Sequence, residues 1–478
     1  MELLEVLSGS VDNDARDELY KELLRNQFHD ILPGTCLPKV YERTLPEFRE
    51  VIDKANERSA ACAKKLTKAA NGISLFNPLS FDFNGVAVLD GNQPVAGGQT
   101  YVDNEGHEKT AVRVTIPAVS AVPVNGTEKK GSPFRADGNT LETPLYTVVF
   151  DEHGYIDSLV DKRVGREVKR AGAAPLGTLW FGEHLPVIYD NWELEDDMFR
   201  KLVPVTAVTS RETVTDGAVE YRIRTAYTLS KHSTAVLDTV FYADDPRIDY
   251  ELKLDWNERH ALLKAGFDVN VHAAFVKNEI QFGHMDRPTT RNNSIEDAKF
   301  EVCNHKWSDI SESRYGVAIL NDCKYGMSAK ESNLCLTLQK GCCRPDPVTD
   351  VGVHTMTYSL LPHVGAFSVE NVVRPAYMLN YKPMVFPGAV EVPALFDMDC
   401  DNIICEAVKA AEDVPGAFVL RLYEAERNTT TCRVTLPGAK EVLITNMLEE
   451  TIETLSPEND TVTLHFRPFE IKTILVKK

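Results

Sequence analysis

The sequence has no apolar run that approaches the roughly 20 residues needed to cross a bilayer. Its first residues, Met1-Glu-Leu-Leu-Glu-Val-Leu7, have neither the basic region nor the long apolar core of a secretory signal. Hydrophobic residues make up 43% of the chain and charged residues 26%, which is typical of a soluble globular protein and argues against disorder. We therefore expect neither a membrane-spanning helix nor a secretory leader.

Positive charge is scarce and is not gathered anywhere along the chain. There are 52 Lys and Arg residues against 71 Asp and Glu residues, which gives a formal net charge of -19. A duplex phosphate backbone would repel such a protein, so nucleic-acid binding is excluded. The sequence also lacks a GxSxG elbow, a Walker A segment and a Rossmann glycine pattern, which argues against those enzyme classes.

The ten cysteines follow no recognisable framework. They are scattered, include the vicinal pair Cys342–Cys343, and form neither a secreted disulfide pattern nor two CxxC knuckles for zinc. Several lie in apolar, strand-like runs, where a free cysteine behaves as a small hydrophobic residue. We predict a reducing, cytoplasmic location.

The first seventy residues have helical periodicity. Apolar side chains recur at steps of three and four over residues 13–32, and Pro33-Gly34 should end that helix. A second helix is expected over residues 38–70, broken near Thr44-Leu-Pro46. Such a short helical bundle has little core of its own, so we expect it to pack on something larger.

From Gly72 onwards the apolar pattern has a period of two, which is typical of strands, with Asn, Gly and Pro between them. Strands without intervening helices favour antiparallel sandwiches over a βαβ sheet. The predicted fold class is mainly β, with a short N-terminal helical bundle followed by several antiparallel β-sandwich domains, the central one a large super-sandwich. The expected domains are a helical bundle (1–71), a small β domain (72–133), a large β-sandwich domain (134–385) and a C-terminal β-sandwich (386–478).

The segment Asn26-Gln-Phe-His-Asp-Ile-Leu-Pro-Gly34 places His29 and Asp30 in the last helical turn before the Pro-Gly stop. One interpretation is structural, because a charged histidine interacts favourably with the negative end of a helix dipole and Asp30 can partner it. The other is a metal ligand, although a single His-Asp pair is a weak signal by itself.

This segment, with Lys39-Val-Tyr41 after it, resembles the one that family 38 glycoside hydrolases (α-mannosidases) carry between their catalytic barrel and helical bundle. The resemblance implies that His29 is a ligand of the active-site zinc and that Asp30 contacts the bound sugar. It extends over the rest of the chain, through segments at residues 74–80, 156–162, 286–292, 315–322 and 468–473.

The resemblance also implies what this chain does not supply. In the family, the other zinc ligands, the nucleophile and the acid/base carboxyl belong to the barrel, whereas a retaining glycosidase needs two carboxyl groups about 5–5.5 Å apart. The predicted function is therefore the C-terminal portion of a metal-dependent retaining α-mannosidase that hydrolyses terminal α-mannosides or oligosaccharides, inactive alone. Its expected partner is the N-terminal barrel of the same enzyme, with a homo-oligomer also possible, and the surface around His29 should be exposed.

Other polar loops offer candidate cleft residues, namely Arg287, Arg291, His305 and Trp307. Trp307 can stack on a sugar ring or lie in the core, and the residues do not decide between the two. The aromatic and acidic loop that begins at residue 189 has no assigned role. An alternative function is a non-catalytic β-sandwich protein that binds carbohydrate or scaffolds a partner, which would make His29 a structural remnant.

Overall fold

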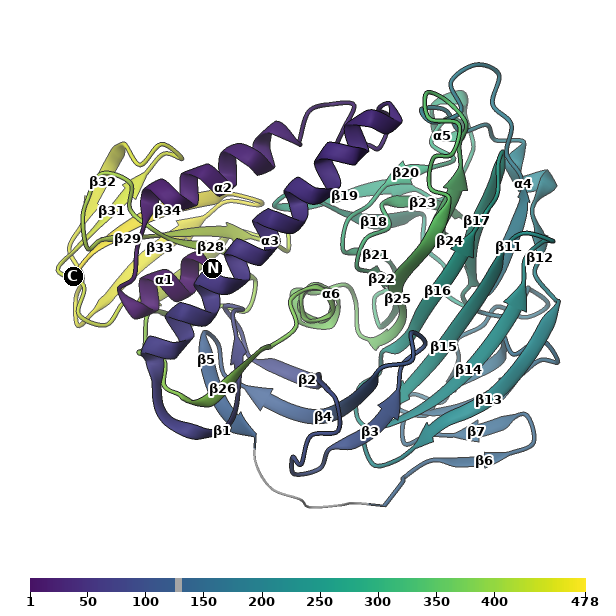
Figure 1. Ribbon diagram of the computed structural model, residues 1–478, viewed down its shortest axis with the longest axis horizontal. Helices are drawn as coiled ribbons and strands as arrows, with labels where there is room; N and C mark the ends of the chain where they lie inside the picture. The colour runs from purple at the N-terminus through teal and green to yellow at the C-terminus, as the bar shows by residue number, and fades with distance from the viewer. Residues whose placement is uncertain (125–130) are drawn as a thin grey trace.

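The computed structural model describes residues 1–124 and 131–478, which form a mainly β protein with helices at its N-terminus. This confirms the predicted fold class. In Figure 1 two long N-terminal helices reach from the C-terminal β unit towards the loops of a much larger β unit. Among the described residues, none of the helices combines the length and the apolar character required to cross a membrane.

The N-terminal helices are α1 (Glu2–Ser8), α2 (Asn13–Arg25) and α3 (Pro38–Leu66). Helix α2 ends earlier than the periodicity predicts. The buried Asn26 side chain donates to the Glu22 carbonyl at 3.0 Å and to Glu47 of α3 at 3.1 Å, and it accepts from Thr44 at 3.0 Å. One side chain thus bonds to the Glu22 carbonyl near the end of α2 and ties this end to α3.

The predicted break in the second helix is wrong, because α3 runs through Pro46 without interruption. Proline removes one helical hydrogen bond. However, Thr44 and Glu47, on either side of it, both bond to the end of α2, so packing overrides the local signal. The helix also ends at Leu66 rather than near residue 70, and a strand follows directly.

Two small sheets have three strands each. The first joins segments far apart in the sequence and consists of β26 (Met384–Val390), β1 (Thr67–Asn77) and β5 (Ser120–Val124). The second consists of β2 (Phe83–Asp90), β4 (Glu108–Ile116) and β3 (Gln99–Val102). Burial alternates along β2, so one face of this small sheet is covered and the other is exposed.

The large β unit is built on a nine-stranded and a six-stranded antiparallel sheet. The nine-stranded sheet contains, in spatial order, β13 (Val208–Asp216), β14 (Glu220–Thr228), β15 (Thr234–Tyr242), β16 (Ile248–Trp256), β25 (Gly352–Val364), β22 (Tyr315–Asn321), β21 (Trp307–Ser311), β18 (Phe275–Ile280) and β19 (Gly283–Pro288). The six-stranded sheet contains β12 (Val203–Pro204), β11 (Thr178–Glu183), β17 (Ala261–Asp268), β24 (Asn333–Gly341), β23 (Gly326–Lys330) and β20 (Val302–Cys303).

Aromatic rings fill the space between these two sheets. Tyr250 and Tyr358 of the larger sheet stack with ring centroids 5.2 Å apart, and Phe267 of the smaller sheet meets Tyr250 edge-on at 5.7 Å. All three are buried, so they hold the sheets face to face. A five-stranded sheet completes the unit, with β10 (Arg166–Glu167), β9 (Ile156–Asp161), β8 (Tyr146–Phe150), β7 (Thr140–Glu142) and β6 (Arg135–Asp137).

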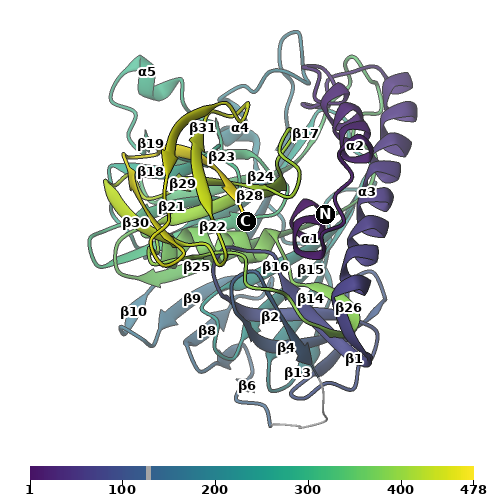
Figure 2. The ribbon, with the colours of Figure 1, turned by 90° about the vertical axis from the view of Figure 1, so that its left-hand side faces the viewer.

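The C-terminal unit is a smaller sandwich, which faces the viewer in Figure 2. Its sheets are β28 (Ile403–Ala410), β29 (Phe418–Glu424), β34 (Ile471–Lys477), β31 (Glu441–Thr445) and β32 (Thr451–Leu455), and β27 (Asp397–Met398), β30 (Thr430–Thr435) and β33 (Thr461–Phe466). The remaining helices are the π-helix η1 (Val369–Val373), α6 (Arg374–Asn380), α4 (Met198–Lys201) and α5 (Ser294–Asp297).

Candidate functional site

His29 and Asp30 lie in the connection between α2 and α3. This connection consists of tight turns, in which the Leu32 amide donates to the Phe28 carbonyl at 3.0 Å and the Thr35 amide to the Asp30 carbonyl at 2.9 Å. The predicted position in the last turn of the helix is wrong, because α2 already ends at Arg25. The helix-dipole interpretation of His29 therefore loses its basis.

The two side chains are paired and open to solvent. His29 Nε2 lies 3.4 Å from Asp30 Oδ2, and the side chains are 70% and 40% exposed. The expected exposure of the surface around His29 is thus what the structure shows. The neighbouring Leu24, Phe28 and Leu32 are also exposed, and the Phe28 and His29 rings lie 4.2 Å apart. The pair sits on an apolar rim rather than in a finished pocket.

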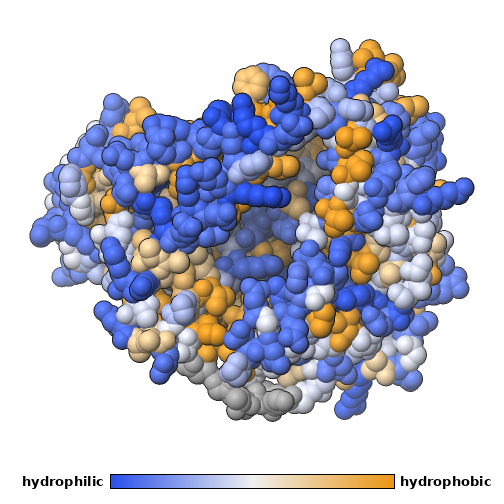
Figure 3. Space-filling view, viewed as in Figure 1, coloured by the Kyte–Doolittle hydropathy of each residue, from blue (hydrophilic) through white to orange (hydrophobic). Residues whose placement is uncertain are grey.

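A loop of the large β unit meets this turn. Asn191 donates to the Gly34 carbonyl at 2.8 Å, and Lys340 donates to the Glu193 carbonyl at 3.0 Å, which holds the same loop on β24. The turn and the loop together expose large apolar side chains, which we call the apolar rim: Leu24, Phe28, Leu32, Leu37, Leu185, Val187, Ile188, Tyr189 and Trp192. Figure 3 shows orange patches along the upper edge of this face and a hollow below them in the centre.

The candidate cleft residues are engaged in the β domains. Arg287 donates to the Cys303 carbonyl at 2.8 Å, and Arg291 lies 3.6 Å from Asp297. His305 Nε2 is 3.2 Å from the Gln281 amide nitrogen. Burial, followed by the charges of Lys306 and Arg287, lowers the pKa of His305.

Trp307 is only 1% exposed. It lies in a core beside Phe367, with ring centroids 5.0 Å apart, and beside His284. No face of its indole is left for a sugar, so the cleft role expected for Trp307 is wrong and its core role holds. Stacking of an aromatic ring on a ligand requires solvent access, which the sequence pattern does not report.

A cavity of about 760 Å³ lies elsewhere, where the small sheet β2–β4–β3, the large unit and α6 meet. Its arginines are already paired: Arg113 lies 2.8 Å from Asp244 and Arg374 3.1 Å from Asp401. This cavity is therefore lined by ion pairs that hold the units together.

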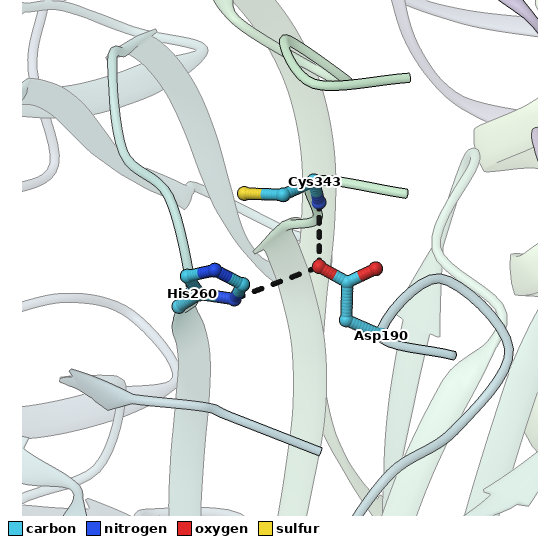
Figure 4. Close-up of side chains that lie close together, drawn as sticks. All are labelled: Asp190, His260 and Cys343. Carbon is cyan, nitrogen blue, oxygen red and sulfur yellow. Dashed lines mark hydrogen bonds and ion pairs between the residues drawn. The ribbon is translucent and has the colours of Figure 1, made fainter. Parts of the chain in front are cut away.

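Sequence reasoning missed one cluster of chemically capable side chains, Asp190, His260 and Cys343 (Figure 4). They come from the loop before α4, the turn between β16 and β17, and the segment after β24. Asp190 is buried and accepts from the backbone amides of Cys343 at 2.6 Å and Arg344 at 3.0 Å. The aromatic-acidic loop and the vicinal cysteines were each visible in the sequence, but nothing in the sequence connects them.

Three family models match the chain. They are described as the alpha mannosidase middle domain (residues 2–66), the glycosyl hydrolases family 38 C-terminal domain (141–348) and the glycosyl hydrolases family 38 C-terminal beta sandwich domain (402–474). The first covers all three N-terminal helices, and the last covers most of the C-terminal sandwich.

Curated relatives match nearly the whole chain. Human alpha-mannosidase 2C1 is 30% identical over 473 residues, which are 96% of this chain and 45% of the relative. Alpha-mannosidase G of Dictyostelium discoideum is 28% identical over 516 residues (95% and 47%), and alpha-mannosidase of Saccharomyces cerevisiae is 27% identical over 502 residues (95% and 43%). The chain thus spans slightly less than half the length of these relatives.

A solved structure, an alpha-mannosidase from Enterococcus faecalis V583, superposes on the whole chain with a TM-score of 0.78. The match covers 65% of that structure, and the sequence identity is 15%. At this identity the likeness shows that the fold is shared.

Proposed function

Because this chain belongs to glycoside hydrolase family 38, of which it carries the middle domain and the C-terminal β domains, we propose that it forms the C-terminal part of an α-mannosidase. In this proposal the whole enzyme hydrolyses terminal α-mannosides with retention, and this chain contributes His29, Asp30 and one wall of the cleft. The observation that carries the proposal is the exposed His29–Asp30 pair on the apolar rim, within the segment matched by the middle domain.

The donors at this turn fit a zinc ion in part. An exposed imidazole and a carboxylate are both groups that zinc accepts, but a catalytic zinc takes about three protein ligands. We propose that His29 is one ligand and that the others come from the catalytic barrel. When bound there, the ion would act as a template and Lewis acid for the sugar. Asp30 would accept a charge-assisted hydrogen bond from a sugar hydroxyl.

The apolar rim supports the proposed partner. Large apolar patches on a protein surface commonly mark contacts with another domain. Here Leu32 and Val187, 71% and 85% exposed, belong to the two segments that the bond from Asn191 to Gly34 joins. We propose that the N-terminal barrel covers this rim and brings the nucleophile and the acid/base carboxyl to the His29 pair.

The thiols support the proposed cytoplasmic location. All ten cysteines are free in the structure, and five of them, including Cys36 and Cys432, are buried. A reducing compartment keeps such thiols unpaired. Whether the enzyme is a homo-oligomer stays a prediction.

The test compares the 478-residue chain with the whole enzyme on an aryl α-mannoside. We expect the chain alone to be inactive with or without zinc, because the carboxyl pair of a retaining glycosidase is expected from the barrel. In the whole enzyme, His29→Ala should lose zinc and turnover, whereas Asp30→Asn should keep zinc and bind sugar more weakly. His232→Ala, in an exposed turn between β14 and β15, is the matched control and should change neither.

The outcomes separate the proposed roles. Full zinc content and normal turnover in His29→Ala would remove this residue from the metal site. Turnover by the highly purified chain alone would contradict the need for a barrel. An inactive whole enzyme that still binds mannosides would favour the alternative of a non-catalytic carbohydrate-binding protein.

A further inference from the structure

Asp190, His260 and Cys343 bring three different ligand atoms close together in the large β unit (Figure 4). A carboxylate oxygen, an imidazole nitrogen and the thiol Sγ all lie within 4.8 Å of one another. We infer that these three side chains form a second metal site, which binds zinc independently of His29. Oxygen, nitrogen and sulfur donors in one cluster are the set that zinc accepts.

The distance between Nδ1 of His260 and Oδ2 of Asp190 fits two ligands of one ion. It is 3.5 Å, longer than the roughly 2.7–3.2 Å of a good N–H···O bond. Two ligands that lie about 2.0–2.2 Å from one tetrahedral ion are about 3.3–3.6 Å apart. The Nδ1 atom of His260 is also buried, and within the described part of the chain it has no hydrogen-bond partner.

Backbone groups hold the ligands in place. The amides of Cys343 and Arg344 each donate to one oxygen of the Asp190 carboxylate, and each oxygen keeps a second lone pair for an ion. Such outer hydrogen bonds commonly orient metal-bound carboxylates. His260 has a φ of 51°, unusual for a residue with a side chain, and its amide donates to the Gly341 carbonyl at 2.6 Å.

The charges of the ligands and the position of the cluster near the surface are also suited to a zinc ion. The Asp190 carboxylate and the Cys343 thiolate neutralise a divalent ion, and binding breaks the S–H bond and releases its proton to solvent as the S–Zn bond forms. The His260 side chain is 40% exposed, so the site lies close to the surface, and in this proposal a water takes the fourth position. Two other groups of potential ligands are weaker, because Glu105 and His107 of one group and Asp399 of the other are exposed, whereas Asp190 is buried.

The proposed ion has a mechanical consequence. It would join the loop that carries Asp190 to the segment after β24 and to the turn at His260. Asn191, the next residue of that loop, donates to Gly34 in the turn of His29. The site would therefore fix the position of the loop that supports the apolar rim.

Metal binding by the purified 478-residue chain tests this inference. After treatment with a chelator, we expect the chain to take up one zinc ion, and the cobalt-substituted chain should show a thiolate-to-cobalt charge-transfer band. Cys343→Ser and His260→Asn should each weaken zinc binding at least about tenfold. Asparagine is chosen because it tolerates the left-handed backbone at this position.

Matched controls are Cys323→Ser, an exposed cysteine, and His232→Ala, both of which should bind zinc normally. His29→Ala should also keep the ion, so failure of this inference and failure of the proposed function are distinguishable. A wild-type chain that takes up no zinc, or a cobalt form without the thiolate band, would overturn the inference whether or not the variants fold. Equal zinc binding by wild type and folded Cys343→Ser would do the same.

Discussion

Two polar clusters of this molecule differ in their exposure to solvent. The His29–Asp30 pair lies in an exposed turn, with the two side chains 3.4 Å apart. The guanidinium of Arg222, in contrast, is buried in the large β unit and bonds to Glu220 at 2.9 Å and to Glu251 at 2.5 Å. A solvent-exposed pair contributes little to the free energy of unfolding and can bind a ligand. A buried charge, in contrast, destabilises the fold when one of its partners is removed.

The Arg222 cluster also joins two sheets. Its guanidinium lies 4.1 Å from the ring centroid of Tyr101 on β3, and it reaches Asp238 on β15 at 3.2 Å. Gln99 of β3 donates to the Glu220 carbonyl at 2.8 Å. Although burial opposes the charged form, the charges of Glu251 and Glu220 raise the pKa of Arg222. This cluster therefore holds the small sheet on the nine-stranded sheet.

The largest effect is expected from Arg222→Met. Methionine keeps much of the aliphatic stem but leaves Glu220 and Glu251 without their cation, whereas Asp238 keeps Arg224, and the change should cost about 3–5 kcal/mol of unfolding free energy. Urea unfolding of the chain measures it. Arg427→Met is the control, because its pair with Asp286 is partly exposed and should be worth at most about 1 kcal/mol. Similar losses in both variants would erase the contrast between buried and exposed pairs.

The difference between local patterns and tertiary contacts explains how much of the fold could be predicted from the sequence. Alternating apolar residues identify strands such as β16 and β24, because each strand has a buried face whose period is set locally. The end of α2 and the continuity of α3 were not predictable in this way. They depend on Asn26 and on its contacts with Thr44 and Glu47, which are tertiary.

The same limit applies to the sites. His29 and Asp30 were found because they are neighbours in a short motif, and their metal and sugar roles stay proposals. Asp190, His260 and Cys343 are widely separated in the sequence, and only the folded loops bring them together. The domain boundaries near residues 71, 133 and 385 also stay a prediction, although β26 shows that the segment after the last of these pairs back with β1.

The next largest effect is a pH dependence of the unfolding free energy, which two buried histidines cause. Burial lowers the pKa of His184 and of His284 to about 4. The unfolded chain protonates these groups near their ordinary pKa, about 6.5, so between these values it binds more protons than the folded chain. Unfolding free energy should therefore fall as pH decreases from about 7 to about 5, by about 1–2 kcal/mol for each histidine.

The variant His284→Phe isolates one of these contributions. Its ring would lie among Trp307, Phe367 and Phe469, which already surround His284. Urea unfolding at about pH 7 and about pH 5 should show a shallower pH dependence for the variant than for wild type. An unchanged slope would mean that His284 stays uncharged for another reason or titrates outside this range.

Asn26→Ala should have a similar or smaller effect on stability. It removes a buried side chain that bonds to Glu22, Thr44 and Glu47, and the cost should be about 1–3 kcal/mol because partners are left unsatisfied. Gln27→Ala, at the exposed neighbouring position, is the matched control and should unfold like wild type. A loss no larger than that of the control would show that Asn26 does not hold α2 against α3.

The smallest effect on folding is expected from His29→Ala in the 478-residue chain. The imidazole is 70% exposed and its contact with Asp30 is open to solvent, so unfolding free energy should change by less than about 0.5 kcal/mol. The ring also touches Phe28, which is itself exposed, so little apolar area returns to water. Urea unfolding of wild type, His29→Ala and Asp30→Asn should give superimposable curves. A loss above about 1 kcal/mol in either variant would show that the pair stabilises the turn. In the proposed function, His29→Ala also loses zinc and turnover in the whole enzyme. An almost unchanged unfolding free energy together with that loss would indicate that His29 acts in binding and contributes little to the fold.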